Sequence, residues 1–512
     1  MKIGILFVLL FLLLLASNFS TTDNAASPSA ANSESALVDS SQNALLDVEQ
    51  KIRRIENGLL LPVIVKGEPS VPMKLADRMQ FYKTPGASVA FINNGRIEWA
   101  RGYGVRQIGS REPVTTETLF QAGSISKAVT AIAALRLVQA GKLSLDEDVN
   151  RKLVSWKVPE NEFTREKKVT LRGLLSHSAG VNVSSFTGYL SGEQVPTLVQ
   201  VLDGEKPANS PAIRVEAIPG SRFNYSGGGF TIIQQLLVDV EKKPFSDLMR
   251  ELVFEPLKMK HSTFEQTLPK NLAVLAAAGH NASGETPTGK RRVFPEMAAA
   301  GMWTTPSDLA RLIIEVQQAQ AEQSNKFIST STVNKMLTVQ SGEWGLGFSV
   351  EGAGLAWRFG HGGSTPEFNS YLTTYNQTGQ GVIIMTNSLR GNALINEILR
   401  SIAREYGWSD FRPKERTIAK IDPKVYADYT GRYEFEFSSD YIVTIGTEAG
   451  NLTTELKQPT GQSKAVIYPQ SETRFFRKDV DVEVSFVKDE MGRVTHLIFH
   501  QEGQELRAKR VK

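Results

Sequence analysis

The chain has 512 residues, which is enough for two or three compact domains of about 150 residues each. Hydrophobic residues make up 41% and charged residues 22%, close to ordinary globular usage, so a fibrous, disordered or multi-span membrane chain is excluded. The net charge of +4 with scattered basic residues argues against nucleic-acid binding, and the absence of cysteine excludes disulfides, thiolate metal sites and a cysteine nucleophile.

The N-terminus has the pattern of an export signal. Lys2 is followed by an apolar run over residues 3–16, so we predict a signal peptide over residues 1–20. An uncleaved membrane anchor is the alternative, because no clear small-x-small cleavage site follows Ala16. Residues 21–44 are rich in Ser, Ala and Asn, which predicts a disordered tether. We therefore expect a periplasmic or extracellular protein, tethered to a membrane only if the signal is uncleaved.

The next predicted unit, residues 45–408, alternates helical and strand patterns. A helix is expected over residues 47–59, and a hairpin over residues 87–92 and 96–103. Four further strand patterns and one helix close the unit, at residues 347–350, 357–360, 370–375, 381–386 and 393–406. Strands at both ends with helices between them predict an α/β (α+β) domain in which helices flank an antiparallel sheet and a helical insertion separates its two halves.

A charged linker is predicted over residues 409–422, and a separate C-terminal domain over residues 423–512. Six short runs with β-branched or aromatic residues lie in this domain, at residues 441–445, 452–456, 466–468, 473–476, 482–487 and 495–500. Gly450, Gly492 and Gly503 mark turns between or after them. The pattern predicts an all-β barrel or sandwich that folds independently.

Ser124 and Lys127 are candidate catalytic residues. They are three positions apart, immediately before an apolar helical stretch over residues 128–140. Residues i and i+3 share a helix face, so the amine would reach the serine oxygen at the positive end of the helix dipole. Burial would lower the pKa of the lysine and allow it to act as the base that a serine nucleophile requires. Ser485 and Lys488 have the same spacing in a strand pattern, where the two side chains would face opposite ways.

Two later segments support Ser124. Residues 219–229 form a glycine-rich turn that carries Tyr225, and residues 359–364 (FGHGGS) form a strand-like segment whose glycines would let a substrate lie along its edge. Ser-x-x-Lys, then Tyr, then His-x-Gly in this order resembles the motifs of the penicillin-recognising serine hydrolases, particularly class C β-lactamases and the related D-aminopeptidases, carboxypeptidases and esterases. The resemblance extends over residues 85–408, and residues 429–433 resemble the start of a β-domain often appended to such hydrolases.

The resemblance implies roles for individual residues. Ser124 would be the acylated nucleophile, with Lys127 and Tyr225 sharing the proton transfers, and which of the two is the principal base stays open. His361, Gly363 and Ser364 would bind substrate. The backbone N–H groups of Ser124 and Ser364 would form the oxyanion hole.

One position departs from the family pattern. Gly227 stands where β-lactamases have an asparagine that helps to hold the lysine and the substrate amide. This change lowers the expectation of efficient β-lactam hydrolysis. Asn224 lies on the other side of Tyr225, and we do not expect it to substitute, because adjacent side chains diverge.

Histidines receive different interpretations. His361 replaces the usual third-motif lysine, and because histidine titrates near neutrality, we predict a pH–rate inflection in the ~6–8 range. His177 is interpreted as a hydrogen-bonded structural residue. The remaining histidines, His261, His280, His496 and His500, show no metal-ligand spacing, so no metal site is predicted.

Other polar segments have structural explanations. Residues 305–308 (TPSD) have the pattern of a helix start, and Gly102 and Gly104 that of a hairpin. Met302 and Trp303 are equally consistent with pocket lining and core packing.

The predicted function is acyl-enzyme hydrolysis of an ester, amide or D-amino-acid peptide without a cofactor. Its partners would be a small-molecule or peptide substrate and no nucleic acid. The alternative is a non-catalytic protein that keeps the fold to bind cell-wall peptide or a partner, for which the missing asparagine is the only support.

Overall fold

A computed structural model describes residues 45–69, 71–458, 461–501 and 503–511. The predicted signal peptide and tether lie outside the described residues. Residues 45–56 are helical, in agreement with the expected first helix. Within the described ranges, we find no helix with the length and apolar character needed to cross a membrane.

A six-stranded antiparallel sheet forms the centre of the first domain. The strands, in spatial order, are β3 (Arg96–Gly104), β2 (Gly86–Asn93), β9 (Gly381–Thr386), β8 (Phe368–Tyr375), β7 (Arg358–Thr365) and β6 (Ser349–Glu351). Strand β2 pairs with β9, so two segments that lie far apart in the sequence share one sheet, as predicted. Both strands are mostly apolar and almost fully buried, because helices cover the two faces of the sheet.

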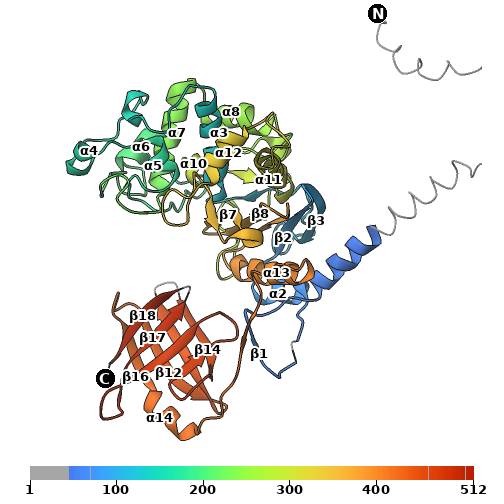
Figure 1. The fold of residues 1–512 in the computed structure, drawn as a ribbon, viewed down its shortest axis with the longest axis vertical. Helices are drawn as coiled ribbons and strands as arrows, with labels where there is room; N and C mark the ends of the chain where they lie inside the picture. The colour runs from blue at the N-terminus through green and yellow to red at the C-terminus, as the bar shows by residue number, and fades with distance from the viewer. Residues whose placement is uncertain (1–44, 70, 459–460, 502, 512) are drawn as a thin grey trace, which may run out of the picture. The chain divides into compact units, whose positions relative to one another are not determined.

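Helices cover this sheet on opposite sides. Helices α2 (Leu75–Phe81) and α13 (Gly391–Glu405) lie below it in Figure 1, and α13 packs on β8 and β9. Helix α11 (Pro306–Gln320) packs on β2, β3 and β9 from above, and the expected start signal is present, since the Thr305 hydroxyl accepts a hydrogen bond from the Asp308 N–H.

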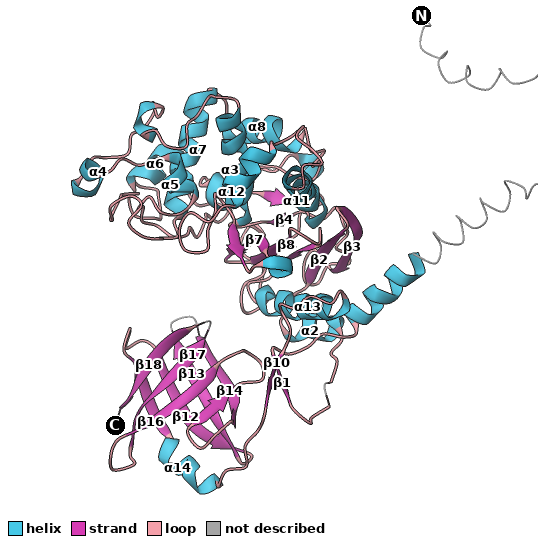
Figure 2. Cartoon of the chain, viewed as in Figure 1, coloured by secondary structure: helices cyan, strands magenta, loops and turns pink. Residues whose placement is uncertain are grey.

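The insertion between β3 and β6 is largely helical, as Figure 2 shows. Its elements are β4 (Phe120–Gln121), α3 (Ile125–Gln139), η1 (Val149–Arg151), α4 (Glu162–Glu166), α5 (Leu171–Leu175), α6 (Leu198–Asp203), α7 (Gly227–Glu241), α8 (Phe245–Met249), η2 (Arg250–Phe254), α9 (Lys270–Ala273), α10 (Met297–Ala300), β5 (Trp303–Thr304), α11 and α12 (Thr330–Leu337). A short helix, η3 (Gly354–Ala356), connects β6 to β7. Helix α3 is buried on nearly every side. Its alanines have small side chains, and α7 and α10 can therefore pack closely against it.

The segment predicted as a linker contains a strand. Strand β10 (Lys414–Arg416) pairs in parallel with β1 (Val63–Val65), and the two central residues of the pair are Ile64 and Glu415. The charged composition of the segment concealed this strand. Two of its charged residues have partners: Lys414 pairs with Asp481, and Arg416 pairs with Asp481 and Glu483.

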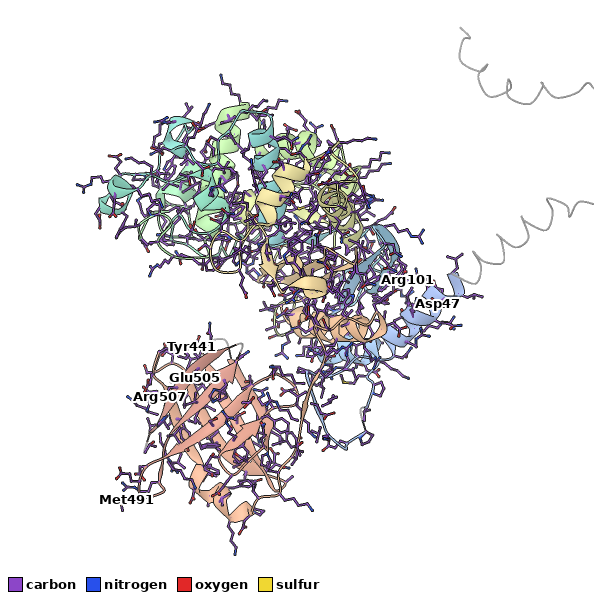
Figure 3. The ribbon with its side chains drawn as sticks, in the orientation of Figure 1. Asp47, Arg101, Tyr441, Met491, Glu505 and Arg507 are labelled. Carbon is purple, nitrogen blue, oxygen red and sulfur yellow. The ribbon has the colours of Figure 1, made fainter. Side chains whose placement is uncertain are left out.

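The C-terminal region is a closed eight-stranded antiparallel barrel, which decides between the predicted barrel and sandwich. Its strands are β11 (Gly431–Phe435), β12 (Ile442–Glu448), β13 (Asn451–Gln458), β14 (Gly461–Pro469), β15 (Arg474–Phe476), β16 (Glu483–Lys488), β17 (Val494–Gln501) and β18 (Gln504–Val511), preceded by η4 (Pro423–Val425) and α14 (Tyr426–Tyr429). Tyr433, Phe475 and Phe486 are buried in its core. Met491 projects from the turn between β16 and β17 (Figure 3).

The first and last strands of the barrel, β11 and β18, are not among the six predicted strands. Strand β18 carries basic residues, and only Ala508 among its residues is buried. Leu506 is partly buried against the barrel core, and the other residues of the strand are mostly polar or charged. Two inward apolar residues among outward charges give too little alternation to be recognised in the sequence.

Candidate active site

Ser124 and Lys127 meet at the start of α3. Ser124 is the N-cap residue of this helix, and Lys127 lies one turn along. The Lys127 Nζ donates a hydrogen bond to the Ser124 Oγ at 3.0 Å and another to the Ala299 carbonyl of α10 at 2.8 Å. These two bonds hold the amine beside the serine oxygen.

Burial changes the acidity of Lys127. The residue is 1% exposed, and this loss of solvation lowers the pKa of its amine to about 7. Its near neighbours include the rings of Tyr225 and Phe230, whose centroids lie 5.2 and 6.0 Å from Nζ. Burial is the only cause of this shift, and no carboxylate of the described residues raises the pKa again, so a large neutral fraction is present at physiological pH.

Tyr225 faces the same serine from the segment that precedes α7. Burial raises the pKa of its hydroxyl to about 12, although a hydrogen bond with Ser124 acts in the opposite direction. The phenol is therefore protonated at neutral pH. Ser124 thus lies between an amine that titrates near neutrality and a hydroxyl that keeps its proton.

His177 holds the backbone on both sides of Tyr225. Its carbonyl accepts a hydrogen bond from the Asn224 N–H at 2.7 Å, and its Nδ1 accepts one from the Ser226 N–H at 3.1 Å. Its ring centroid lies 4.3 Å from that of Tyr225. The predicted structural role agrees with these contacts, and their position makes His177 a support for the tyrosine.

The asparagine that β-lactamases carry has no counterpart in this geometry. A Cβ atom at Gly227 would lie 3.0 Å from the Ser184 carbonyl oxygen and 3.1 Å from the Phe186 ring, so a side chain at this position would require these neighbours to move. The Asn224 amide donates to the Val181 carbonyl instead of entering the site. As expected from the sequence, Asn224 does not replace the missing amide.

Glycines bring strand β7 against the serine segment. A Cβ at Gly363 would lie 2.0 Å from the Ala122 carbonyl oxygen, and a Cβ at Gly123 would lie 2.7 Å from the Ser364 N atom. These contacts exclude side chains at both positions and bring the backbones of residues 122–124 and 363–364 together. The predicted oxyanion-hole donors, the N–H groups of Ser124 and Ser364, are thus in neighbouring segments.

Strand β7 also has an open edge at this place. Strand β6 pairs with β7 only as far as Gly360, whereas β8 pairs along the whole of β7. Among the residues that the structure describes, 361–365 therefore have no strand partner on the β6 side. An extended substrate could pair with this edge.

His361 is buried, and its imidazole does not titrate in the range that the sequence led us to expect. The side chain is 4% exposed, its Nδ1 donates to the Gly362 carbonyl at 2.5 Å, and its buried Nε2 has no partner. Burial and the nearby Lys127 lower the pKa of this imidazole to about 3, so it stays neutral across the range in which the inflection was expected. Lys127, whose pKa is about 7, titrates in that range instead.

Comparison with known proteins identifies the family. A family model described as Beta-lactamase matches residues 74–405. The chain belongs to the Beta-lactamase family. A second family model, a domain of unknown function called DUF3471, matches residues 415–510, which contain the barrel.

Similar proteins agree with this assignment. Protein flp of Staphylococcus aureus strain N315 is 23% identical over 59% of this chain, and the match covers 59% of its own length. The putative penicillin-binding protein PbpX of Bacillus subtilis is 24% identical over 64% of this chain and 79% of its own length.

Two solved structures share the fold. The octameric penicillin-binding protein homologue of Pyrococcus abyssi has a TM-score of 0.56 and 22% identity, and the match covers 85% of this chain and 98% of that chain. The D-amino acid amidase of Ochrobactrum anthropi SV3, complexed with L-phenylalanine amide, has a TM-score of 0.53 and 21% identity. The match covers 65% of this chain and 97% of that chain.

Several site features of this Beta-lactamase family chain were missed in the sequence. The Ala299 carbonyl that fixes Lys127 carries no side-chain signal. The Trp344 ring lies beside Tyr225 and the Phe223 ring stacks on Trp344, but both residue types are common in ordinary cores. Met302 and Trp303 are fully buried in the core and do not line an opening. Among the residues that the structure describes, no cluster of three or more His, Asp or Glu side chains could bind a metal ion.

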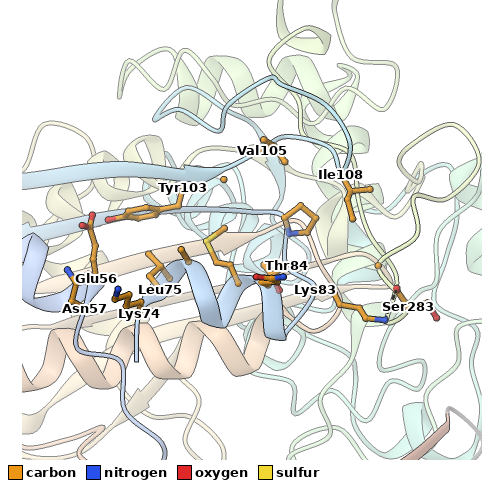
Figure 4. Close-up of a pocket in the computed structure, with 16 residues that line it drawn as sticks. Glu56, Asn57, Lys74, Leu75, Lys83, Thr84, Tyr103, Val105, Ile108 and Ser283 are labelled. Carbon is orange, nitrogen blue, oxygen red and sulfur yellow. Dashed lines mark hydrogen bonds between the residues drawn. The ribbon is translucent and has the colours of Figure 1, made fainter. Parts of the chain in front are cut away.

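A large apolar groove lies elsewhere in the domain. It has a volume of about 790 Å³, and its lining includes Leu75, Met79, Tyr103 and Val105 (Figure 4). None of the candidate catalytic residues lines it. We therefore base the functional argument on the residues around Ser124.

Proposed function

We propose that this chain is a serine hydrolase that forms an acyl-enzyme on Ser124. The observation that carries the proposal is the buried Lys127 amine, which lies 3.0 Å from the Ser124 Oγ and has a pKa of about 7. A serine hydroxyl becomes a nucleophile when a neighbouring group can accept its proton at the working pH. Membership of the Beta-lactamase family supports serine hydrolase chemistry in general.

Acylation would begin with Ser124. Its Oγ attacks the substrate carbonyl carbon while its proton moves to the neutral Lys127 Nζ. The N–H groups of Ser124 and Ser364 stabilise the oxyanion that forms. As the bond to the leaving group breaks, the leaving oxygen or nitrogen takes a proton from the Tyr225 hydroxyl, which regains one from Lys127.

Deacylation would use the same groups. A water molecule attacks the acyl carbonyl carbon and gives its proton to the Tyr225 hydroxyl oxygen, whose own proton moves to the neutral Lys127 Nζ. The bond between the acyl carbon and the Ser124 Oγ then breaks. The proton returns to Ser124, and a free acid leaves. The enzyme is then restored with one water molecule consumed per substrate.

The substrate class that we propose is an ester, amide or D-amino-acid peptide. Its extended part would pair with residues 361–365, the open edge of β7. One protein of similar fold is a D-amino acid amidase, and this supports including amides. The absence of an amide side chain at Gly227 places β-lactams below esters among the candidates. We also propose that the protein is exported, on the pattern of residues 1–20.

The second candidate is a binding protein that keeps the fold without turnover. The observation in its favour is the enclosed Gly227, because an asparagine side chain is absent from the place where β-lactamases use one. A binding role would not require a lysine with a lowered pKa beside the serine. We therefore favour the hydrolase.

A panel of acyl donors would test the proposal. The panel would contain 4-nitrophenyl acetate, D-amino-acid amides and a chromogenic cephalosporin, with the wild type and Ser124→Ala compared on each. We expect turnover of at least one ester or amide, reduced by roughly 10³-fold or more in Ser124→Ala. Absence of turnover on every compound, or turnover that Ser124→Ala leaves unchanged, would refute the hydrolase.

A further inference from the structure

Two aromatic rings that the proposed chemistry does not use stand beside Tyr225. Phe223 and Trp344 are stacked, with ring centroids 6.0 Å apart and an interplanar angle of 20°. The Trp344 ring centroid lies 5.6 Å from that of Tyr225 and 5.1 Å from that of His361. Phe223 is 37% exposed and Trp344 is partly exposed, so this aromatic pair reaches solvent at the site.

The main chain fixes Trp344 in this position. Its N–H donates to the Ser341 carbonyl at 3.0 Å, and its own carbonyl accepts from the Gln340 N–H at 2.7 Å. It also forms an isolated bridge to Ser349, the first residue of β6. On its inner side the indole contacts the His177 ring edge-to-face, with centroids 5.0 Å apart. The ring is therefore pre-positioned, which reduces the entropy lost when a ligand packs against it.

The charges around the aromatic pair do not favour an anionic ligand. Lys127 is buried behind Tyr225 and already donates to Ser124 and Ala299. His361 donates through Nδ1 to its own strand, so the neutral ring offers only a lone pair at Nε2. The exposed chain neighbours of the pair, Arg222 and Glu343, have opposite charges. Since Lys127 is buried and His361 is neutral, Arg222 is the exposed cation among these groups, and the acidic Glu343 offsets its charge.

Phe223 and Trp344 lie on the side of the scissile bond that carries the leaving group. In the proposed mechanism Tyr225 protonates the leaving atom, so the leaving group must lie against the Tyr225 hydroxyl. Trp344 contacts both Tyr225 and His361 and therefore borders the leaving group rather than the oxyanion. A flat ring on this side could extend the stack that Phe223 and Trp344 begin.

We propose that Phe223 and Trp344 form a subsite for an uncharged aromatic leaving group, so that the preferred substrates are aryl esters or aryl amides without a carboxylate on that side. The subsite rests on the proposed function, because it needs Ser124 and Tyr225 to act on the bond beside it. It narrows the substrate class of the same site.

Three acetate esters would test the subsite: phenyl acetate, 3-carboxyphenyl acetate and 2,2,2-trifluoroethyl acetate. The first two have phenols of similar leaving ability and differ in charge, whereas the third has no ring. For the wild type we expect kcat/KM for phenyl acetate to exceed that for the carboxylated ester by about tenfold or more, because a carboxylate would lose hydration beside an Arg222 whose charge Glu343 offsets. The variants are Trp344→Leu and Phe223→Leu, with Phe81→Leu as the control, since Phe81 is an exposed aromatic residue on α2.

We expect Trp344→Leu to lower kcat/KM for phenyl acetate by between about twofold and tenfold, the range for loss of one aromatic stack, mainly through KM. The trifluoroethyl ester should lose less, and Phe81→Leu should change neither ester. Equal losses on both esters in Trp344→Leu, with circular dichroism as in the wild type, would overturn the subsite. Preference for the carboxylated ester that Arg222→Gln removes would also overturn it and assign a carboxylate site to Arg222.

Failure of the subsite is distinguishable from failure of the proposed function. If Ser124→Ala leaves the hydrolysis of all three esters unchanged, the proposed function fails whatever the ratios are. If hydrolysis depends on Ser124 but the ratios do not depend on Trp344 or Phe223, only the subsite fails.

Discussion

Serine and lysine stand three residues apart at two places in this chain, in different surroundings. Ser124 and Lys127 begin helix α3, where the amine is buried and lies 3.0 Å from the serine oxygen. Ser485 and Lys488 lie on strand β16 of the barrel. There the serine hydroxyl pairs with His500 at 2.9 Å, and the amine pairs with Asp428 at 3.5 Å.

The two lysines consequently differ in acidity. Burial without a carboxylate lowers the pKa of Lys127, whereas Tyr429 and Asp428 raise the pKa of Lys488, although partial burial opposes them. The first amine can accept a proton at neutral pH and the second cannot. The spacing of the two residues therefore does not determine their chemistry. The burial of the amine and the carboxylate beside it do.

Replacing the two lysines would sharpen this comparison most. Lys127→Met should lower kcat/KM on the best ester by about 10³-fold to 10⁴-fold, because Ser124 loses the group that takes its proton. Lys488→Met, which has the same change in side chain, should leave kcat/KM within about twofold. Steady-state kinetics of both variants, with thermal unfolding as a check on folding, would measure this. Comparable losses in the two variants would contradict the distinction.

Removal of the tyrosine hydroxyl should have the next largest effect. Tyr225→Phe keeps the ring contacts with His177 and Trp344 but loses the proton donor, so we expect kcat to fall by about 10²-fold, within the range for general acid catalysis. Substrates with poor leaving groups should lose more than 4-nitrophenyl esters, since the latter leave without protonation. An equal loss of kcat on both kinds of substrate would show that Tyr225 does not donate the proton to the leaving group.

The pH profile should follow Lys127. A base with a pKa of about 7 is mostly protonated at pH 6 and mostly neutral at pH 8, so kcat/KM should rise by about tenfold over this range. His361→Gln should leave the midpoint in place, because the wild-type imidazole has a pKa of about 3 and is neutral throughout. A midpoint that moves or disappears in His361→Gln would show that His361, and not Lys127, is the group whose titration controls kcat/KM.

Replacing His177, which supports Tyr225, should have the smallest effect on kcat among these variants. His177 has a φ of +57°, a conformation that asparagine tolerates better than phenylalanine. His177→Phe leaves the buried Ser226 N–H without its acceptor, and we expect kcat to fall by roughly tenfold with KM little changed. His177→Asn should recover part of the loss, because its amide oxygen can accept from that N–H. Equal losses in both variants would reduce His177 to a packing residue.

Much of the fold could be predicted because its elements have strong local patterns. The buried apolar runs of β2 and β9 and the hairpin of β2 and β3 were recognisable, and so was the helix start at Thr305. Strands β10 and β18 were not, because their charged residues find partners only in the folded chain. The hydrophobic periodicity of a segment identifies a strand when the side chains of that strand form the core. It does not identify a strand whose own side chains are mostly charged and which is held by pairing with its neighbours.

Some features of the candidate site could likewise be predicted from the sequence, and others could not. Ser124, Lys127, Tyr225 and His361 carry recognisable side chains in a recognisable order. The surroundings that determine their acidity come from residues distant in sequence, such as the Ala299 carbonyl beside Lys127. For this reason the sequence identified His361 but assigned it the wrong titration.

Mapping the site of a covalent adduct tests the central claim most directly, because one molecule contains both serines. The full chain would be treated with a fluorescent phosphonate at pH 8, digested, and analysed by mass spectrometry. We expect one adduct, on the peptide that contains Ser124, which is absent in Ser124→Ala and unaffected in Ser485→Ala. An adduct on Ser485, or labelling that persists in Ser124→Ala, would contradict the assignment of Ser124 as the nucleophile.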